Sequence, residues 1–157
     1  MTRPHPFRRI ITGHDDAGKA MILEDAECPH AYPVTGGVIT TELWSHAGPP
    51  KNSADYTDPI TPDVTVPPPS HGSVFRVVEF PPGDGAEPYQ HRTASLDYCY
   101  VVSGEIYALV EDEERLMRPG DTLVQRGTLH SWDNRSSEPC CVLFVLIDAP
   151  PLDWVQS

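Results

Sequence analysis

The chain has 157 residues and a formal net charge of −12 at pH 7 with its histidines neutral. A chain of this length favours a single domain with its own hydrophobic core. The negative charge argues against a nucleic-acid partner, because sequence-independent binding of phosphates needs a basic surface. No apolar run approaches the roughly 20 residues that cross a bilayer, so we expect no membrane partner either.

The cysteines point to a reducing compartment. The basic first residues are not followed by a long apolar segment, which predicts no secretory signal. The four cysteines, Cys28, Cys99, Cys140 and Cys141, contain no CxxC pair. We therefore expect free thiols in a cytoplasmic protein.

Extended segments separated by turns are predicted for the first half of the chain. Residues 8–12 and 20–25 are expected to form two strands around a turn, and residues 38–46 a third. The stretch from 47 to 70 is rich in proline and too long for a simple connection. We expect an ordered arm or lid there, because Tyr56, Ile60 and Val64 give it apolar side chains to bury.

The second half of the chain contains closely spaced strand patterns and almost no helical periodicity. Strands are predicted at 73–80, 90–94, 96–103, 104–112, within 113–121, and at 122–127, 129–134 and 140–149. The last run is almost wholly apolar, which is typical of a strand buried on both sides. Only a short helix at 152–155 is expected. This pattern predicts an all-β sandwich or barrel spanning residues 1–157 as one domain.

Two histidines and one carboxylate are the candidates for chemistry. His91 and Thr93 are two residues apart, so on a strand they face the same side. Asp97 is the only carboxylate between His91 and Glu105. His130 comes from a different strand, and we expect the imidazoles of His91 and His130 to converge with Asp97 inside the domain. These groups can transfer protons or bind a metal near neutral pH.

Neighbouring side chains are candidates for a substrate pocket. Cys99 and Val101 share the strand parity of Asp97, and Trp132 shares that of His130, either as a pocket wall or as core. Tyr89 is expected at the mouth of the pocket. One of the two charges in the 73–80 strand, on Arg76 or Glu79, is expected to face inward or into a subunit interface. The predicted substrate-binding residues are Arg76, Tyr89, Thr93, Cys99, Val101 and Trp132.

The spacing of these residues resembles the first motif of the cupins, a family of small jelly-roll barrels. The chain has Gly85, then His91, Thr93, Asp97 and Gly104 at the motif's intervals. Thr93 takes the place of the motif's second histidine, and Asp97 the place of its glutamate.

A second stretch resembles the second cupin motif, with Gln125 where proline is usual. The matching residues are Pro119, Gly120, Gly127, His130 and Asn134. The resemblance covers roughly residues 70–149, leaving the N-terminal strands and arm (1–70) and a tail (150–157) as additions. It implies a jelly roll that forms a homodimer, in which such additions often pack on the partner. Edge strands of an open sheet are best covered, which agrees with dimerisation.

The resemblance leaves the cofactor and the reaction open. The cupin metal set would here be reduced to His91, Asp97 and His130, which could hold iron, manganese, nickel or zinc. The alternative is a metal-free pocket in which the same residues act as general acid and base. We expect an enzyme acting on a small oxygenated or carboxylated molecule as a decarboxylase, dehydratase, isomerase or cyclase. The alternatives are a metal-dependent, non-haem iron dioxygenase and a non-catalytic binding protein.

Overall fold

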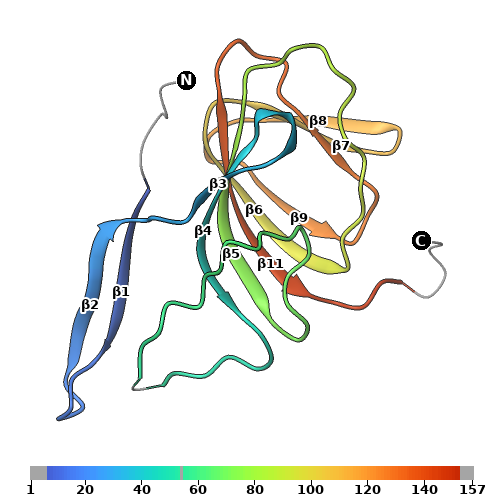
Figure 1. Cartoon of the computed structure of the whole chain (residues 1–157). Coiled ribbons are helices and arrows are strands. Elements are labelled where there is room, and N and C mark those ends of the chain that lie inside the picture. The colour runs from blue at the N-terminus through green and yellow to red at the C-terminus, as the bar shows by residue number, and fades with distance from the viewer. Residues whose placement is uncertain (1–6, 54, 153–157) are drawn as a thin grey trace.

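A computed structural model describes residues 7–53 and 55–152 of the chain, and strands dominate it (Figure 1). The only helical element in this part is the single 3-10 turn η1 (Thr35–Gly37). The strands are β1 (Arg8–His14), β2 (Ala20–Glu27), β3 (Ala31–Pro33), β4 (Ile39–His46), β5 (Ser73–Phe80), β6 (Ser95–Ser103), β7 (Ile106–Val110), β8 (Glu113–Met117), β9 (Thr122–Arg126), β10 (Ser131–Asp133) and β11 (Cys140–Asp148). The all-β prediction is confirmed.

The strands form two facing sheets and a separate hairpin. The larger sheet has the order β3-β4-β5-β11-β6-β9, and the smaller has the order β10-β7-β8. All their strand pairs are antiparallel. Buried apolar side chains from β6, β7, β8 and β11 form one cluster between the two sheets. The β1–β2 hairpin projects away from this body, as Figure 1 shows.

Alternating burial along the central strands shows which side chains face the core. In β6, the side chains of Ser95, Asp97, Cys99 and Val101 are buried, whereas Tyr98 and Tyr100 are exposed. This is the predicted period-two pattern of a strand with one face on the core.

Strand β11 lies between β5 and β6, as expected for the most apolar segment. Cys140 belongs to the core cluster, and Cys141 is also buried on the opposite face. Further along, Leu143 and Val145 on the outer face are only half-buried. The predicted burial on both sides therefore holds only for the start of β11. Further along, the described chain leaves the outer face partly uncovered.

The predicted strand at 90–94 is the main difference from expectation. Only His91 pairs there, through an isolated antiparallel bridge to His130. The chain then turns, because the Ser95 amide donates to the Thr93 carbonyl at 2.8 Å. This turn ends the extended run and begins β6. The helix expected at 152–155 falls beyond Leu152, outside the described residues.

The arm at residues 47–70 is a loop whose two ends meet. The Gly48 amide donates to the Ser70 carbonyl at 3.1 Å. Gly72 is required at this junction, since a Cβ there would lie 1.8 Å from the His46 carbonyl oxygen. Tyr56, Ile60 and Val64 are partly buried, as predicted for an ordered arm. No helix in the described chain is long and apolar enough to span a membrane.

A row of apolar side chains crosses the outer face of the larger sheet. Phe75, Val145, Tyr98 and Val124 lie opposite one another on β5, β11, β6 and β9. Exposure reaches 48% for Tyr98 and 60% for Val124. Contiguous exposed apolar surface of this kind marks interaction sites. It is where we expect a second copy of the chain to bind, so homodimerisation stays a prediction with a defined surface.

We predict that the double variant Tyr98→Glu, Val124→Glu is a monomer, because two carboxylates would have to be buried in the interface. Sedimentation equilibrium should give twice the 17.4 kDa chain mass for the unmodified protein and 17.4 kDa for the variant. Arg115→Glu, at an exposed position of β8 in the smaller sheet, is the control and should leave the dimer intact. A monomeric unmodified protein would contradict the prediction.

Candidate active site

The two predicted histidines lie side by side because their backbones pair. The amide of each donates to the carbonyl of the other at 2.9 Å, which makes the isolated bridge. The ring centroids of His91 and His130 are 4.3 Å apart, with an interplanar angle of 54°. Segments distant in sequence therefore deliver two imidazoles to one place, as expected from the motifs.

Backbone carbonyls orient both rings. His130 Nδ1 lies 2.9 Å from the Thr128 carbonyl oxygen, and His91 Nδ1 lies 3.3 Å from that of Tyr89. A neutral imidazole that donates from Nδ1 keeps Nε2 free of a proton. Burial, together with the neighbouring His91, lowers the pKa of His130 against the opposing effect of the Thr128 carbonyl. His130 is therefore neutral near pH 7 and can accept a proton at Nε2.

Asp97 occupies the inward face of β6 and is only 4% exposed. Its Oδ1 atom has no hydrogen-bond partner. Burial raises the pKa of Asp97, although the Ser95 side chain and the charges of His91 and Arg76 oppose this shift. A buried carboxyl with a raised pKa and an unsatisfied oxygen is suited to hold and release a proton.

Arg76 is the inward-facing charge of β5, which resolves the choice between it and Glu79. Its Nε lies 3.0 Å from Glu42 Oε1, and its Nη2 donates to the Thr65 carbonyl of the arm at 2.8 Å. Burial lowers the pKa of Arg76, while Glu42 and Asp97 act to raise it. Glu79 lies on the opposite face of β5 and is also buried. An inward arginine is a natural partner for a substrate carboxylate, but the Arg76 guanidinium already faces the Glu42 carboxylate of its own chain.

Three of the remaining candidates for the substrate pocket are buried side chains. Thr93, Cys99 and Val101 are all buried, and Cys99 and Val101 belong to the core cluster. Burial raises the pKa of the Cys99 thiol, which makes it a poor nucleophile. All four cysteines are free thiols, as predicted.

Aromatic rings surround the two histidines. Tyr89 is 79% exposed and stacks on His91, with centroids 5.4 Å apart. Trp132 meets His130 edge-on at 6.3 Å and Phe144 at 5.4 Å, and it packs against the core cluster. That Tyr89 and Trp132 bind a substrate stays a prediction.

The side chains described do not fit a three-ligand metal centre. Across residues 7–53 and 55–152, no group of three or more His, Cys, Asp or Glu side chains is arranged to hold a metal ion. Aspartate is one methylene shorter than glutamate, and metal–ligand distances tolerate errors of only about 0.2 Å. His91 and His130 are brought together, but Asp97 does not complete a ligand set with them. Metal binding stays a prediction.

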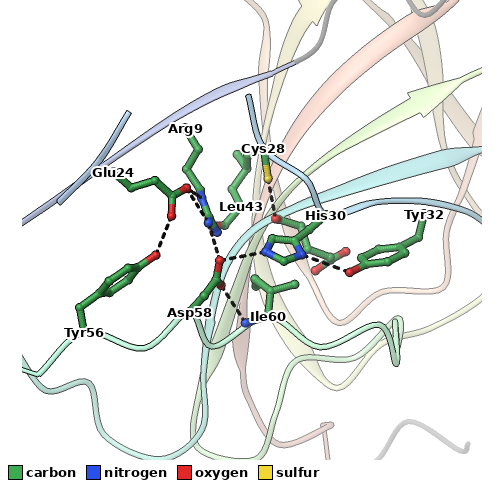
Figure 2. A network of polar contacts seen from close by, with 10 residues as sticks. Arg9, Glu24, Cys28, His30, Tyr32, Leu43, Tyr56, Asp58 and Ile60 are labelled. Atoms are coloured by element: carbon green, nitrogen blue, oxygen red, sulfur yellow. Dashed lines mark hydrogen bonds and ion pairs between the residues drawn. The ribbon is translucent and has the colours of Figure 1, made fainter. Parts of the chain in front are cut away.

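A second polar cluster, here called the Asp58 latch, ties the arm to the β1–β2 hairpin (Figure 2). Its members are Arg9, Glu24, His30, Tyr56 and Asp58. Arg9 donates to Glu24 Oε1 from Nε at 2.9 Å and to Asp58 from Nη2. His30 Nε2 lies 2.9 Å from Asp58 Oδ2, and the Tyr56 hydroxyl donates to Glu24 Oε2 at 2.9 Å.

The hydrogen bonds of the latch shift the pKa values of its members, which are partly shielded from water. Partial burial alone would raise the pKa of Asp58, but hydrogen bonds from Arg9, His30 and the Ile60 amide together hold it well below its usual value. Burial and the bond to Glu24 raise the pKa of Tyr56 to about 12. No motif in the sequence indicates this cluster. Its one local signal is Asp58 before Pro59, where the carboxylate accepts from the backbone two residues on.

The family model for the cupin domain matches residues 76–146, which hold both histidines and Asp97. A cupin-domain-containing oxidoreductase of Neurospora crassa is 32% identical over 156 residues, covering 94% of this chain and 76% of that protein. The chain belongs to the cupin family.

Two further relatives support this assignment, and one solved structure shares the fold. A cupin-domain-containing oxidoreductase of Aspergillus ruber is 35% identical, covering 94% of this cupin and 78% of that protein. Phomopsin biosynthesis cluster protein C′ of Diaporthe leptostromiformis is 34% identical, with coverage of 92% and 80%. The crystal structure of an RmlC-like cupin from Shewanella frigidimarina shares the fold, with a TM-score of 0.51, 17% identity and coverage of 76% and 83%.

We predict that Asp58→Asn lowers the free energy of unfolding by about 2 kcal/mol at neutral pH, because charge-assisted hydrogen bonds are lost. The folded-state pKa of Asp58 is lowered, so the unfolded chain takes up this proton first as the pH falls. The stabilisation is thus complete above about pH 4, the unfolded value, and is lost as the pH drops through the folded value.

Thermal unfolding at several pH values tests this. The difference in Tm between the unmodified protein and Asp58→Asn should be largest near about pH 6. It should shrink toward about pH 2.5, because carboxyl groups take up protons over this range. Asp112→Asn, in an exposed turn, is the matched control and should show no such trend. A constant difference at all pH values would refute a charged latch.

Proposed function

We propose that this cupin is an enzyme that transfers protons on a small oxygenated molecule, using His130, His91 and Asp97. The observation that supports it is the backbone bridge that sets two imidazoles 4.3 Å apart on the side where a carboxyl is buried. The names of the relatives, which include oxidoreductases, support enzyme status in a coarser way.

The chemistry follows from the protonation states. Neutral His130 accepts a proton at Nε2 from a carbon next to a carbonyl, because its Nδ1 is committed to the Thr128 carbonyl. Asp97, whose pKa is raised by burial, donates a proton to an oxygen or carbon of the same molecule. His91 stacks on Tyr89 and contacts the ring of His130 at a tilt of 54°, which places it beside the proposed base. Positioned acid–base pairs of this kind contribute about 10²–10⁴-fold to a rate.

This pair of proton transfers accommodates several reactions. When His130 removes the proton next to a carbonyl and Asp97 protonates the carbonyl oxygen, an enol forms. Return of the proton from His130 to another carbon, with the enol proton going back to Asp97, completes an isomerisation. Protonation of a hydroxyl group instead releases water and completes a dehydration. In a decarboxylation, carbon dioxide leaves and Asp97 protonates the carbon left behind. In a ring closure, a hydroxyl of the same molecule attacks the carbonyl carbon while His130 takes its proton and Asp97 protonates the carbonyl oxygen.

Oxidoreductase chemistry is the second candidate, because the relatives in Neurospora crassa and Aspergillus ruber carry that name. Two of the histidines needed for a metal are adjacent, although the described side chains form no three-ligand group. Elemental analysis of protein purified without added metal separates the candidates. Stoichiometric iron would favour the oxidoreductase, and protein with no metal that remains active would favour acid–base chemistry.

We predict that His130→Ala and Asp97→Asn each reduce kcat at least about 100-fold, the usual contribution of a general acid or base. Deuterium uptake from D2O into a bound carbonyl compound, followed by mass spectrometry, measures the same proton transfer before any product forms. His14→Ala, in the exposed hairpin, is the control. Turnover that survives both active-site changes would exclude the roles proposed, and ligand binding without exchange or turnover would indicate a binding protein.

The pH dependence is expected to follow His130. Because burial places the pKa of His130 below its usual value of 6.5, the ascending limb of kcat/KM should have its half-maximal point below 6.5. At higher pH, kcat/KM should fall again where Asp97 loses the proton that it donates. Protonation of the base at lower pH removes its lone pair and thereby the activity. A half-maximal point of the ascending limb above 6.5 would contradict a buried, neutral His130.

A further inference from the structure

A recess of about 230 Å³ lies between the arm and the inward sides of β4 and β5. Its inner wall carries Glu42, Ser45 and Arg76, and its outer wall is formed by arm residues that include Asp63 and Thr65. This volume is below the about 300–1,000 Å³ typical of drug-sized ligands. The recess therefore suits a molecule the size of a single ring.

Arg76 lies on the same inward face of the larger sheet as Asp97, with β11 between their two strands. The Arg76 side chain lines the recess and is only 7% exposed. Its charge also acts on Asp97, which faces the same interior from β6. A small molecule in the recess would therefore touch Arg76 on the face of the larger sheet that also carries Asp97.

The charges around the recess disfavour an anion. The guanidinium of Arg76 is matched by the Glu42 carboxylate at 3.0 Å, and Thr40 Oγ1 holds that carboxylate through a 2.8 Å hydrogen bond. Asp63 adds a second carboxylate to the lining. The positive charge is thus already balanced, and a bound carboxylate would face excess negative charge in a partly enclosed site.

Polar groups that suit hydroxyls remain available on the walls. Glu42 and the Thr65 carbonyl are acceptors, and His46 donates from Nδ1 to the Gly48 carbonyl when neutral, leaving Nε2 as an acceptor. The Nε atom of Arg76 is buried against Glu42 and is not exposed on the wall. This wall therefore mainly offers acceptors, which suit the O–H group of an alcohol.

We propose that this recess binds the uncharged, hydroxyl-bearing part of the substrate, and that the Arg76–Glu42 pair selects against carboxylates. The inference rests on the proposed function only in directing the other end of the molecule toward His91 and His130. It narrows the substrate class, because the carboxylate expected from an inward arginine is already supplied by Glu42. The Asp58 latch has a part in this site, since it holds the arm that forms the outer wall.

Benzyl alcohol and benzoate are matched probes that differ in charge and little in size. Titrations followed by NMR, with the Arg76 Nε–H and the Thr65 amide as reporters, give both the place and the affinity of binding. Benzyl alcohol should bind at least about tenfold tighter than benzoate, the effect of about one unfavourable charge contact. Equal affinities, tighter binding of benzoate, or no shift at these reporters would overturn the inference.

Charge-switch variants sharpen the test. Glu42→Gln removes the internal carboxylate at nearly constant shape and should raise benzoate affinity about tenfold or more while benzyl alcohol changes little. Asp63→Asn, at an exposed position, should raise benzoate affinity by a smaller factor. It keeps the test decisive if Glu42→Gln does not fold. Asp112→Asn is the control for a general loss of negative charge, and an equal gain from it would overturn the assignment to the recess.

The two proposals fail separately. The His130→Ala variant should keep the preference for benzyl alcohol, because His130 does not line the recess. If the preference is observed but neither exchange nor turnover occurs, the proposed function is wrong and the recess stands. If exchange depends on His130 but benzoate binds as well as benzyl alcohol, the recess proposal alone is wrong.

Discussion

The backbone bridge between His91 and His130 is the contact on which the candidate active site depends. Its two hydrogen bonds, each 2.9 Å, join the loop before β6 to the segment before β10. Because β6 belongs to the larger sheet and β10 to the smaller, the bridge links the two sheets at one end of the core. Backbone pairing fixes the positions of both imidazoles more firmly than side-chain packing alone could. The carbonyls of Tyr89 and Thr128 then fix which ring nitrogen points inward.

The ion pair of Arg76 and Glu42 is the second constraint, and it acts on chemistry more than on stability. Burying two charges costs free energy that their attraction often only balances. The pair therefore needs a reason beyond stability. Its position gives one, because Arg76 touches the arm through Thr65, lines the recess and influences Asp97. A single guanidinium thus lies between the wall proposed to receive a ligand and the carboxyl proposed to deliver a proton.

Sequence reasoning succeeded where a contact is local or periodic. The alternation in β6 placed Asp97, Cys99 and Val101 on one face, and the motif spacing brought His91 to His130. It failed where a hydrogen bond between near neighbours in sequence overrides the strand pattern. The bond from the Ser95 amide to the Thr93 carbonyl makes the turn that ends the predicted strand. It could not find the latch, since Arg9 and Asp58 are separated by 49 positions and neither belongs to a repeated pattern. Parity also left Arg76 and Glu79 equivalent, because both faces of β5 are buried there.

The segment before the cupin domain, with the hairpin and the arm, supplies part of the surroundings of the candidate site. The family model covers only residues 76–146, yet the relatives in Neurospora crassa and Aspergillus ruber match 94% of the chain. These alignments must therefore extend into the first 75 residues, where Glu42, the arm and the latch lie. The cupin domain alone supplies the imidazoles, Asp97 and Arg76. The partner that neutralises Arg76 and the wall that encloses the recess come from the preceding segment. Two cupins with the same motif residues can therefore accept different molecules, because the charge that a substrate meets is set outside the motifs.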